Sequence, residues 1–196
     1  WFDFWRGLYD DLPGDTRTDI VFPPQRELTA AHRQALKKRL TDTDVGSEAV
    51  FVAGQALYAL LESLGVRPDA MVGHSSGESS ALCAGGALAS GDPAQLAGFM
   101  REINQVYLGF LNDGQIPTGA MLAVGALPQT TVREHLAGEY SEIMIAMDNC
   151  SNQVVLFGQP TRIRALQETL QAAGGICIPL PFERAYHTPL FAPISA

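Results

Sequence analysis

The chain has 196 residues, of which 46% are hydrophobic and 17% charged; this composition excludes a disordered or coiled-coil chain and suits one globular domain. Its formal net charge of −8 argues against nucleic acid as a partner, because phosphate binding needs a basic surface. The sequence contains no apolar run of the roughly 18 residues that cross a bilayer, so no membrane partner is expected.

The three cysteines, Cys83, Cys150 and Cys177, lie far apart and lack the spacing of metal ligands. An odd number of separated cysteines is typical of reduced thiols in a cytoplasmic protein, and no metal site is expected. The sequence shows no signal peptide. It begins with Trp1 and ends with Ala196, and neither end has the character of a natural terminus, so we expect an internal piece of a longer polypeptide.

The first half of the chain predicts a layer of helices around one buried strand. Residues 1–25 are aromatic and turn-rich and are expected to form a connector that ends at Pro23-Pro24. Apolar side chains at three- and four-residue spacing predict helices, with Ser47 as the expected N-cap of the second and Gly65 just beyond its end. These helices span residues 28–40, 47–64, 76–89 and 93–110. The apolar run 70–73 is too short for a helix and predicts a buried strand.

The second half of the chain predicts strands at 120–125, 142–147, 153–157 and 176–180, with helices at 128–137 and from about 160. This β-α-β-β-α-β order is typical of a ferredoxin-like subdomain. The predicted fold is therefore α/β. A large α/β-hydrolase-like layer with a short parallel sheet comprises residues 1–118 and 181–196 and is incomplete at both ends. A small ferredoxin-like subdomain spans 119–180.

The stretch Gly73-His74-Ser75-Ser76-Gly77 has the spacing of a nucleophile elbow. In such a turn a strand stops and a helix begins within about two residues, which strains the backbone at the serine and requires small neighbours. The serine hydroxyl then projects from the turn, and the N–H of Ser76, at the start of a helix, can stabilise an oxyanion. Chance occurrence is the alternative, but the flanking strand and helix patterns favour a catalytic serine.

A serine nucleophile needs a base, and the chain offers four histidines. His32 and His135 lie on charged helix faces and are expected to be solvated, whereas His74 adjoins the serine and is expected to pack or hydrogen-bond locally. His187 follows the last predicted strand, where the chain returns to the large layer and a cleft is expected. His187 is therefore the candidate base.

Several motifs resemble those of acyltransferase domains, the malonyl-CoA:acyl-carrier-protein transacylases and their relatives in polyketide and fatty acid synthases. The block Gly73-His74-Ser75-Ser76-Gly77-Glu78 matches the G-H-S-x-G-E signature of that family. Four further matches follow the family's order, namely Leu64-Gly65-Val66-Arg67-Pro68-Asp69, Ala84-Gly85-Gly86-Ala87-Leu88, Asn149 with Val154-Val155-Leu156-Phe157-Gly158, and Ala185-Tyr186-His187-Thr188-Pro189. The paired serines look closest to iterative polyketide (enediyne-type) or polyunsaturated fatty acid synthases.

The resemblance implies that Ser75 carries the acyl group and that His187 acts as general base and then acid. It assigns Arg101, 26 residues after Ser75, to the carboxylate of a malonyl group, although a solvated helix arginine is the alternative. The resemblance also implies that Tyr186, a bulky aromatic residue just before the histidine, disfavours an α-methyl branch on the acyl group. Arg184 departs from the family, which has a smaller or imidazole side chain at that position. The expected substrate contacts are Arg101, Ser76, His74, Tyr186 and Asn149.

The same resemblance implies malonyl-CoA as substrate, no permanently bound cofactor, and a carrier protein whose phosphopantetheine thiol accepts the acyl group. Ketosynthase and carrier domains of a synthase in antibiotic biosynthesis are the expected neighbours. The candidate docking surface for the carrier is the helix that contains Arg33, Lys37, Lys38 and Arg39. The sequence lacks the family's G-Q-G-S-Q loop, so this stretch alone is expected to be poorly active.

Two other functions stay open at this stage. A serine hydrolase would need a carboxylate beside the histidine, and Asp148 is the one suitably placed acid. A non-catalytic docking module would keep the fold without a Ser75–His187 pair within reach.

Overall fold

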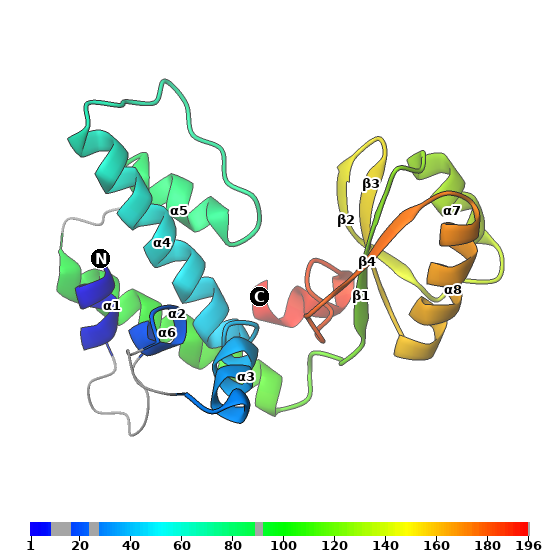
Figure 1. Ribbon diagram of the computed structural model, residues 1–196, viewed down its shortest axis with the longest axis horizontal. Coiled ribbons are helices and arrows are strands. Elements are labelled where there is room, and N and C mark those ends of the chain that lie inside the picture. The colour runs from blue at the N-terminus through cyan, green and yellow to red at the C-terminus, as the bar shows by residue number, and fades with distance from the viewer. Residues whose placement is uncertain (9–16, 24–27, 89–91, 196) are drawn as a thin grey trace. The chain divides into compact units, whose positions relative to one another are not determined.

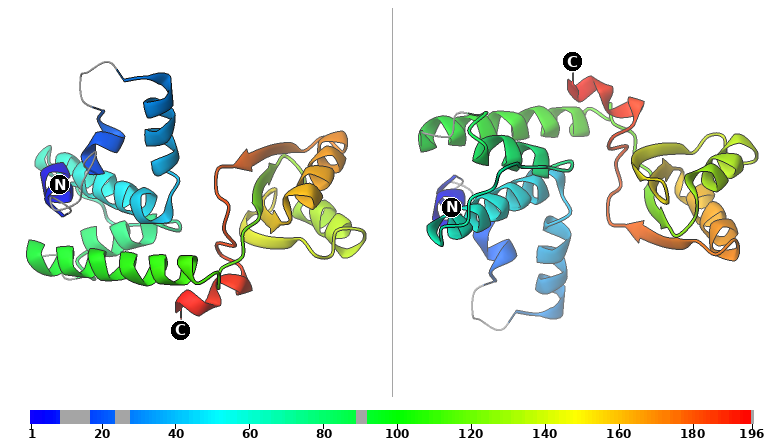
Figure 2. Two further views of the ribbon diagram at one scale, coloured as in Figure 1. Left: turned by 90° about the horizontal axis from the view of Figure 1, so that it is seen from below. Right: turned by 90° about the horizontal axis from the view of Figure 1, so that it is seen from above.

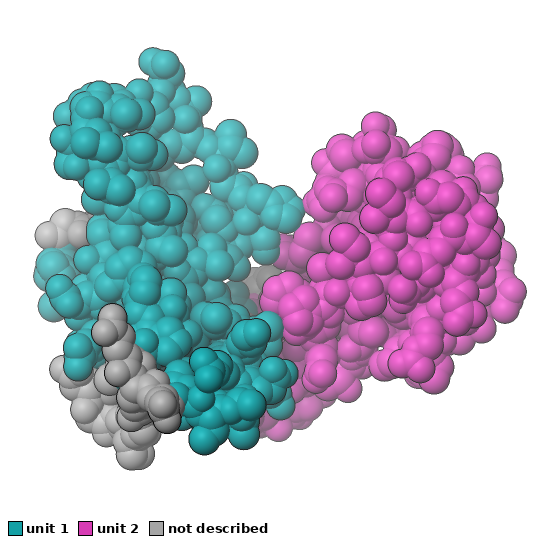
Figure 3. Space-filling model, in the orientation of Figure 1, with its two compact units in different colours: residues 1–107 teal, residues 108–196 magenta. Residues whose placement is uncertain are grey.

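A computed structural model describes residues 1–8, 17–23, 28–88 and 92–195. The chain forms an α/β fold with two compact units, Trp1–Tyr107 and Leu108–Ala196, which Figure 3 colours separately. The first unit is helical, and the second contains a sheet with two helices.

The described part of the first unit contains six helices, which are labelled in Figure 1. They are α1 (Phe2–Gly7), α2 (Arg17–Val21), α3 (Ala30–Arg39), α4 (Thr43–Ser63), α5 (Gly77–Ala84) and α6 (Pro93–Asn112), the last of which continues into the second unit. The four helices predicted from the sequence are confirmed. The prediction of a connector over residues 1–25 is wrong for α1 and α2, because Trp5 is fully buried in the core of this unit. Residues 9–16 and 24–27, including Pro24, lie outside the described residues.

Helix α4 differs from its prediction at its start but not at its end. It begins after Asp42, five residues before the predicted N-cap Ser47. It ends at Ser63, and the chain turns away at Gly65, whose φ is +81°. The Gly65 N–H donates to the carbonyl oxygen of Glu62, and the Val66 N–H donates to that of Leu61. These two bonds form a Schellman motif, which favours glycine at the left-handed position.

The apolar side chains that predict α4 do not form its buried face. Leu57 is 62% exposed and Leu64 is 70% exposed, and Val50, Leu60 and Leu61 are exposed as well. The buried face instead carries Val45, Phe51 and Val52 together with polar residues at 44, 48 and 55. The periodicity therefore predicted the helix correctly but not which side of it is buried.

The predicted strand at 70–73 does not form. The segment is extended, but it belongs to no strand, and the side chain of Val72 is 96% exposed. A strand requires a neighbour with which to pair its backbone, and the described part of the first unit contains no other strand. The predicted parallel sheet is therefore absent from the described residues.

A buried polar network links four helices in the core of the first unit. The Glu48 carboxylate of α4 accepts a hydrogen bond from the Trp5 indole N–H at 2.8 Å and another from Asn104 of α6. Arg17 of α2 forms an ion pair with Asp44 at 3.1 Å and lies 3.6 Å from Glu48. A buried charge is tolerated only when it is paired, so these contacts hold α1, α2 and α6 against α4.

The second unit contains a four-stranded antiparallel sheet in the order β2-β3-β1-β4. The strands are β1 (Ala120–Gly125), β2 (Met144–Cys150), β3 (Gln153–Gly158) and β4 (Ile176–Leu180), and the helices are α7 (Gln129–Ala137) and α8 (Pro160–Ala172). The β-α-β-β-α-β element order predicted from the sequence is confirmed.

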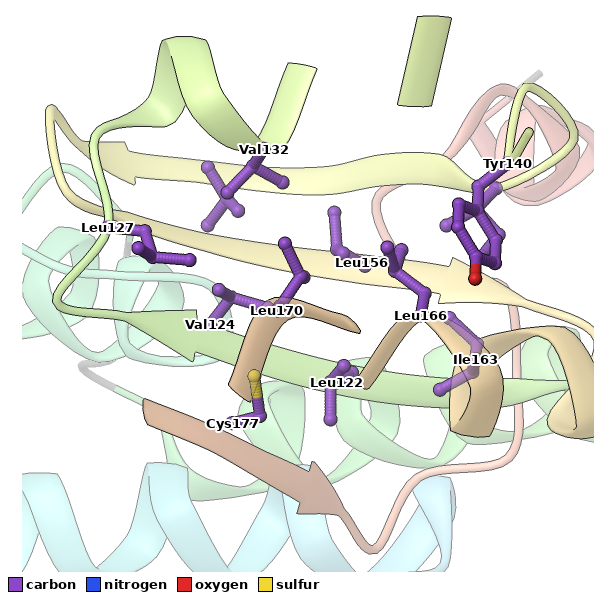
Figure 4. Packing of buried hydrophobic residues seen from close by; sticks show 12 residues of the cluster. Leu122, Val124, Leu127, Val132, Tyr140, Leu156, Ile163, Leu166, Leu170 and Cys177 are labelled. Carbon is purple, nitrogen blue, oxygen red and sulfur yellow. The ribbon is translucent and has the colours of Figure 1, made fainter. Parts of the chain in front are cut away.

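The two faces of this sheet pack against different parts of the second unit. Helices α7 and α8 lie on one face of the sheet (Figure 2). Alternate residues such as Leu122 and Val124 point toward these helices and pack with Val132, Leu166 and Leu170 (Figure 4). Met121 and Phe157 point to the opposite face. There they pack against a set of residues from both ends of the unit, which includes Phe110, Leu111, Ala185, Tyr186, Phe191 and Ile194.

Residues 181–196, which the sequence analysis assigned to the large subdomain, therefore belong to the second compact unit. The physical reason is that Ala185 is fully buried against the sheet, with Tyr186 and Phe191 packed around it.

Candidate active site

The chain turns sharply at Ser75, as the sequence predicts. Ser75 has a φ of +52°, and Ser76, the N-cap of α5, already has right-handed helical angles. The amide of Gly77 donates to the His74 carbonyl oxygen at 2.9 Å, and the amide of Glu78 donates to the Ser75 carbonyl oxygen at 3.0 Å. An extended segment is thus converted into a helix across a single left-handed residue.

The two glycines of the motif have different roles in this turn. A Cβ atom at Gly73 would lie 2.4 Å from both Glu78 Cα and the Gly77 carbonyl oxygen, which are backbone atoms that cannot move aside. A Cβ at Gly77 would meet no heavy atom of the described chain within 4 Å. The turn itself therefore requires Gly73, whereas Gly77 leaves open space beside the serine.

The N–H of Ser76 has no hydrogen-bond partner among the described residues. It lies at the N-terminus of α5, where the first backbone N–H groups of a helix are unpaired and the helix dipole is positive. An oxyanion that forms beside Ser75 could accept a hydrogen bond from this group.

Helix α4 fixes the position of α5. Gln55 is 3% exposed, and its side-chain amide donates to the carbonyl oxygen of Ser80 at 2.8 Å. A Cβ at Gly54 would lie 3.0 Å from the Ser80 hydroxyl oxygen, so the two helices approach closely at this point. Sequence reasoning missed Gln55; the available signal was a polar residue seven positions after Glu48, on the same face of the helix.

Arg101 lies in α6, within the same unit as Ser75, and its side chain is exposed. Its Nη1 donates to the carbonyl oxygen of Leu8, the C-cap of α1, at 3.3 Å. One arm of the guanidinium is therefore anchored at a helix C-terminus, and its other donors have no hydrogen-bond partner among the described residues.

The candidate base His187 belongs to the second unit and follows a compact turn. His187 is exposed and has a φ of +58°. The Thr188 hydroxyl, which is buried, donates to the Ala185 carbonyl oxygen at 2.7 Å, and the Tyr186 amide donates to Arg184 at 2.8 Å. Ala126 is the third non-glycine residue with positive φ in the described chain, beside Ser75 and His187.

Tyr186, which precedes the candidate base, is held by two other aromatic rings. Its ring centroid lies 6.1 Å from that of Phe182 in an edge-to-face arrangement and 5.3 Å from that of Phe191. Such pairs are favourable beyond the area that they bury. The ring therefore has a defined position beside His187.

The carboxylate that a hydrolase triad would need is engaged elsewhere. Asp148 of β2 forms an ion pair with Arg133 of α7 at 3.3 Å, and no contact joins it to His187 within the described chain. Asn149, the next residue, is exposed, and its side-chain amide donates to Gln153 at 3.4 Å. The pairing of Asp148 with Arg133 removes the main argument for a triad.

No group of three or more His, Cys, Asp or Glu side chains in the described ranges could hold a metal ion. Burial raises the pKa of the Cys177 thiol above its ordinary value, as in a structural cysteine. Within the same ranges, no helix is both long enough and apolar enough to cross a membrane.

The sequence matches the acyl transferase domain family over residues 16–195. The chain belongs to the acyl transferase domain family. Residues 75 and 187, which both have left-handed backbone angles, fall within the matched range. The prediction made from the G-H-S-x-G-E block is therefore confirmed at the level of the family.

Relatives of this acyl transferase domain are synthases of much greater length. It is 33% identical to mycoketide-CoA synthase of Mycobacterium tuberculosis over 172 residues, which are 87% of this chain and 4% of the relative. It is 38% identical to norsolorinic acid synthase of Emericella nidulans over 141 residues, 71% of this chain and 6% of the relative. The domain thus spans a small part of the length of these proteins.

Solved acyltransferase structures resemble this domain as well. The acyltransferase domain from the second module of the salinomycin polyketide synthase is 28% identical, with a TM-score of 0.67, and the match covers 98% of this chain and 40% of that one. The acyltransferase domain of an iterative polyketide synthase in enediyne biosynthesis is 30% identical, with a TM-score of 0.61 and coverage of 79% and 39%.

Proposed function

We propose that this domain transfers a malonyl group from CoA to the phosphopantetheine thiol of an acyl carrier protein through an acyl-serine intermediate on Ser75. The observation that carries the proposal is the backbone of the two candidate residues: Ser75 and His187 both have φ angles near +55°, at +52° and +58°. A left-handed conformation costs a non-glycine residue about 1–3 kcal/mol, and residues with such strained angles cluster at active sites.

The reaction has two half-reactions in the proposed mechanism. The Ser75 hydroxyl oxygen attacks the thioester carbonyl of malonyl-CoA while the His187 imidazole accepts the hydroxyl proton. The Ser76 N–H donates a hydrogen bond to the tetrahedral oxyanion. The C–S bond then breaks, and the CoA sulfur leaves with the proton from His187. The carrier thiol next attacks the acyl-serine by the same steps in reverse.

Substrate selection rests on Arg101 and Tyr186. The guanidinium of Arg101 would bind the malonyl carboxylate, for which a planar fork of donors is suited. The fixed ring of Tyr186 would oppose an α-methyl branch, which favours malonyl over methylmalonyl. His74 and Asn149 are proposed as further substrate contacts, and the reaction needs no permanently bound cofactor.

The carrier is proposed to dock on α3. This helix carries four basic side chains and no acidic one, in a chain whose net charge is −8. Arg33 donates to the Leu28 carbonyl oxygen and Arg39 pairs with Asp42, whereas Lys37 and Lys38 are exposed. Carrier proteins are usually acidic, so these two lysines, the only lysines of the chain, would provide charge complementarity.

The wider context is also part of the proposal. The domain would act in the cytoplasm beside ketosynthase and carrier domains of a polyketide synthase, of the iterative kind in antibiotic biosynthesis. Its first unit would be α/β-hydrolase-like, with an extended segment before the nucleophile turn and a helix after it. The second unit would be ferredoxin-like, as its element order and antiparallel sheet suggest.

The test is acylation of the full-length protein by malonyl-CoA labelled in the acyl group. We expect label on the peptide that contains Ser75, no label in Ser75→Ala, and a large loss of loading rate in His187→Ala. Label that persists in Ser75→Ala would overturn the proposed nucleophile. Free malonate released as fast as CoA, without transfer to a carrier thiol, would favour the hydrolase instead.

A further inference from the structure

Arg184 departs from the family motif, which has a smaller or imidazole side chain at this position. In the structure the Arg184 side chain is half-buried, and its Nη1 donates to the carbonyl oxygen of Ile116 at 3.1 Å. Ile116 is 1% exposed and belongs to the core on the face of the sheet opposite α7 and α8. The arginine therefore joins the segment before His187 to a rigid part of the second unit.

Two backbone contacts reinforce this junction. Arg184 forms an isolated antiparallel bridge with Thr118, and the Gly119 amide donates to the Glu183 carbonyl oxygen at 2.9 Å. Residue 119 directly precedes β1, so the junction is an extension of the sheet. The chain is fixed at residues 183–184, three residues before the candidate base.

A second anchor lies on the other side of the turn. Ala185 is fully buried, and its carbonyl oxygen accepts both the Thr188 hydroxyl at 2.7 Å and the Thr188 amide at 3.3 Å. His187, with a φ of +58°, lies in the sequence between the contacts of residues 183–184 and those of Thr188. A strained backbone angle persists only where the surroundings determine it, and the contacts of residues 184 and 188 do so.

We propose that Arg184 is a positioning residue, whose hydrogen bond to the Ile116 carbonyl oxygen fixes the turn that presents His187 to the reaction. This inference rests on the proposed function of His187 as the base. Because Arg184 acts on the histidine and not on the acyl group, its loss slows every acyl substrate by the same factor. An arginine that bound the substrate carboxylate would instead affect malonyl-CoA selectively.

The experiment compares Arg184→Ala, Arg184→Lys and the matched control Arg133→Ala in the full-length protein. Arg133 is an exposed arginine of the same unit whose partner is Asp148. Rates of acyl loading on Ser75 are measured with malonyl-CoA and with acetyl-CoA as functions of pH and substrate concentration. Thermal melting shows whether each variant is folded, and hydrogen exchange at the Tyr186 and Thr188 amides reports on the turn itself.

We expect Arg184→Ala to lower the maximal loading rate about 10- to 100-fold with both substrates, with unchanged KM and an unchanged midpoint of the pH profile. Arg184→Lys should recover part of the rate, Arg133→Ala should match the wild type, and exchange at Thr188 should accelerate only in Arg184→Ala. Loss confined to malonyl-CoA, or a folded Arg184→Ala with unchanged rate and exchange, overturns the proposal. If the wild type fails to load Ser75, the proposed function fails, while the exchange rates still decide whether Arg184 fixes the turn.

Discussion

The amide of Glu78 donates to the carbonyl oxygen of Ser75 at 3.0 Å, although Ser75 itself has the left-handed φ of +52°. The nucleophile thus ends an extended segment and also accepts a hydrogen bond from the first turn of α5. The next amide, that of Ser76, has no acceptor among the described residues. A change that displaces Glu78 from Ser75 should therefore damage the turn and the oxyanion site together.

Replacement of Gly73 by alanine should cause such a displacement. The added Cβ would lie 2.4 Å from Glu78 Cα, so the backbone must shift. We expect Gly73→Ala to lower the free energy of unfolding by about 1–3 kcal/mol, measured by urea denaturation, and to abolish acyl loading. Gly77→Ala is the structural control, because its Cβ meets nothing within 4 Å and its stability should be unchanged or slightly higher. Equal stability of the two variants would contradict this account of the turn.

Replacement of Glu48 by glutamine should destabilise the first unit. The buried carboxylate is the shared partner of Trp5, Arg17 and Asn104, and its neutralisation leaves Arg17 with one anion fewer. We expect a loss of about 2–4 kcal/mol in the free energy of unfolding, together with a change in the wavelength of tryptophan emission because the partner of the Trp5 indole N–H has changed. Glu62→Gln, which removes an exposed partner of Arg67, should cost less than about 1 kcal/mol.

Reversal of the charges on α3 should weaken the second half-reaction alone. In Lys37→Glu/Lys38→Glu we expect the KM for an acidic carrier to rise about tenfold at low salt, less at high salt, with loading from malonyl-CoA unchanged. Arg67→Glu provides a charge reversal elsewhere in the first unit. A carbodiimide, which couples amines to carboxylates, should cross-link the carrier at Lys37 or Lys38. An unchanged KM with no such cross-link would exclude α3 as the docking surface.

The pH dependence of stability should reveal the pair between Glu142 and Arg162. The hydrogen bond from Arg162 holds the pKa of Glu142 below its ordinary value of 4.5. A carboxylate with a lowered pKa stabilises the fold above the unfolded-state pKa, and this contribution is lost as the pH falls through the folded-state pKa. Arg162→Ala should return the pKa of Glu142 toward 4.5, as measured by NMR titration. The difference in unfolding free energy between the wild type and Arg162→Ala should shrink as the pH falls through the pKa of Glu142 in the folded wild type. A difference that stays constant down to pH 2 would exclude this linkage.

The sequence by itself determined the elements whose signals are local. The strand and helix periods over residues 120–180 predicted the four strands and two α-helices of that stretch within a few residues, because alternation and helical spacing are properties of short segments. The turn at Ser75 was equally predictable, since a serine between two glycines suits a left-handed residue beside a close backbone approach. The same motifs also identified the family.

Only the tertiary structure decided the features that depend on a distant partner. The face of α4 that is buried was set by Trp5 and Arg17, not by the leucines that make the helix recognisable. The segment 70–73 has the composition of a strand, yet no strand forms without a neighbour to accept its hydrogen bonds. Likewise, Asp148 pairs with Arg133, 15 positions away, and Arg184 donates to the carbonyl oxygen of Ile116, 68 positions away. A local sequence pattern carries no information about such pairs.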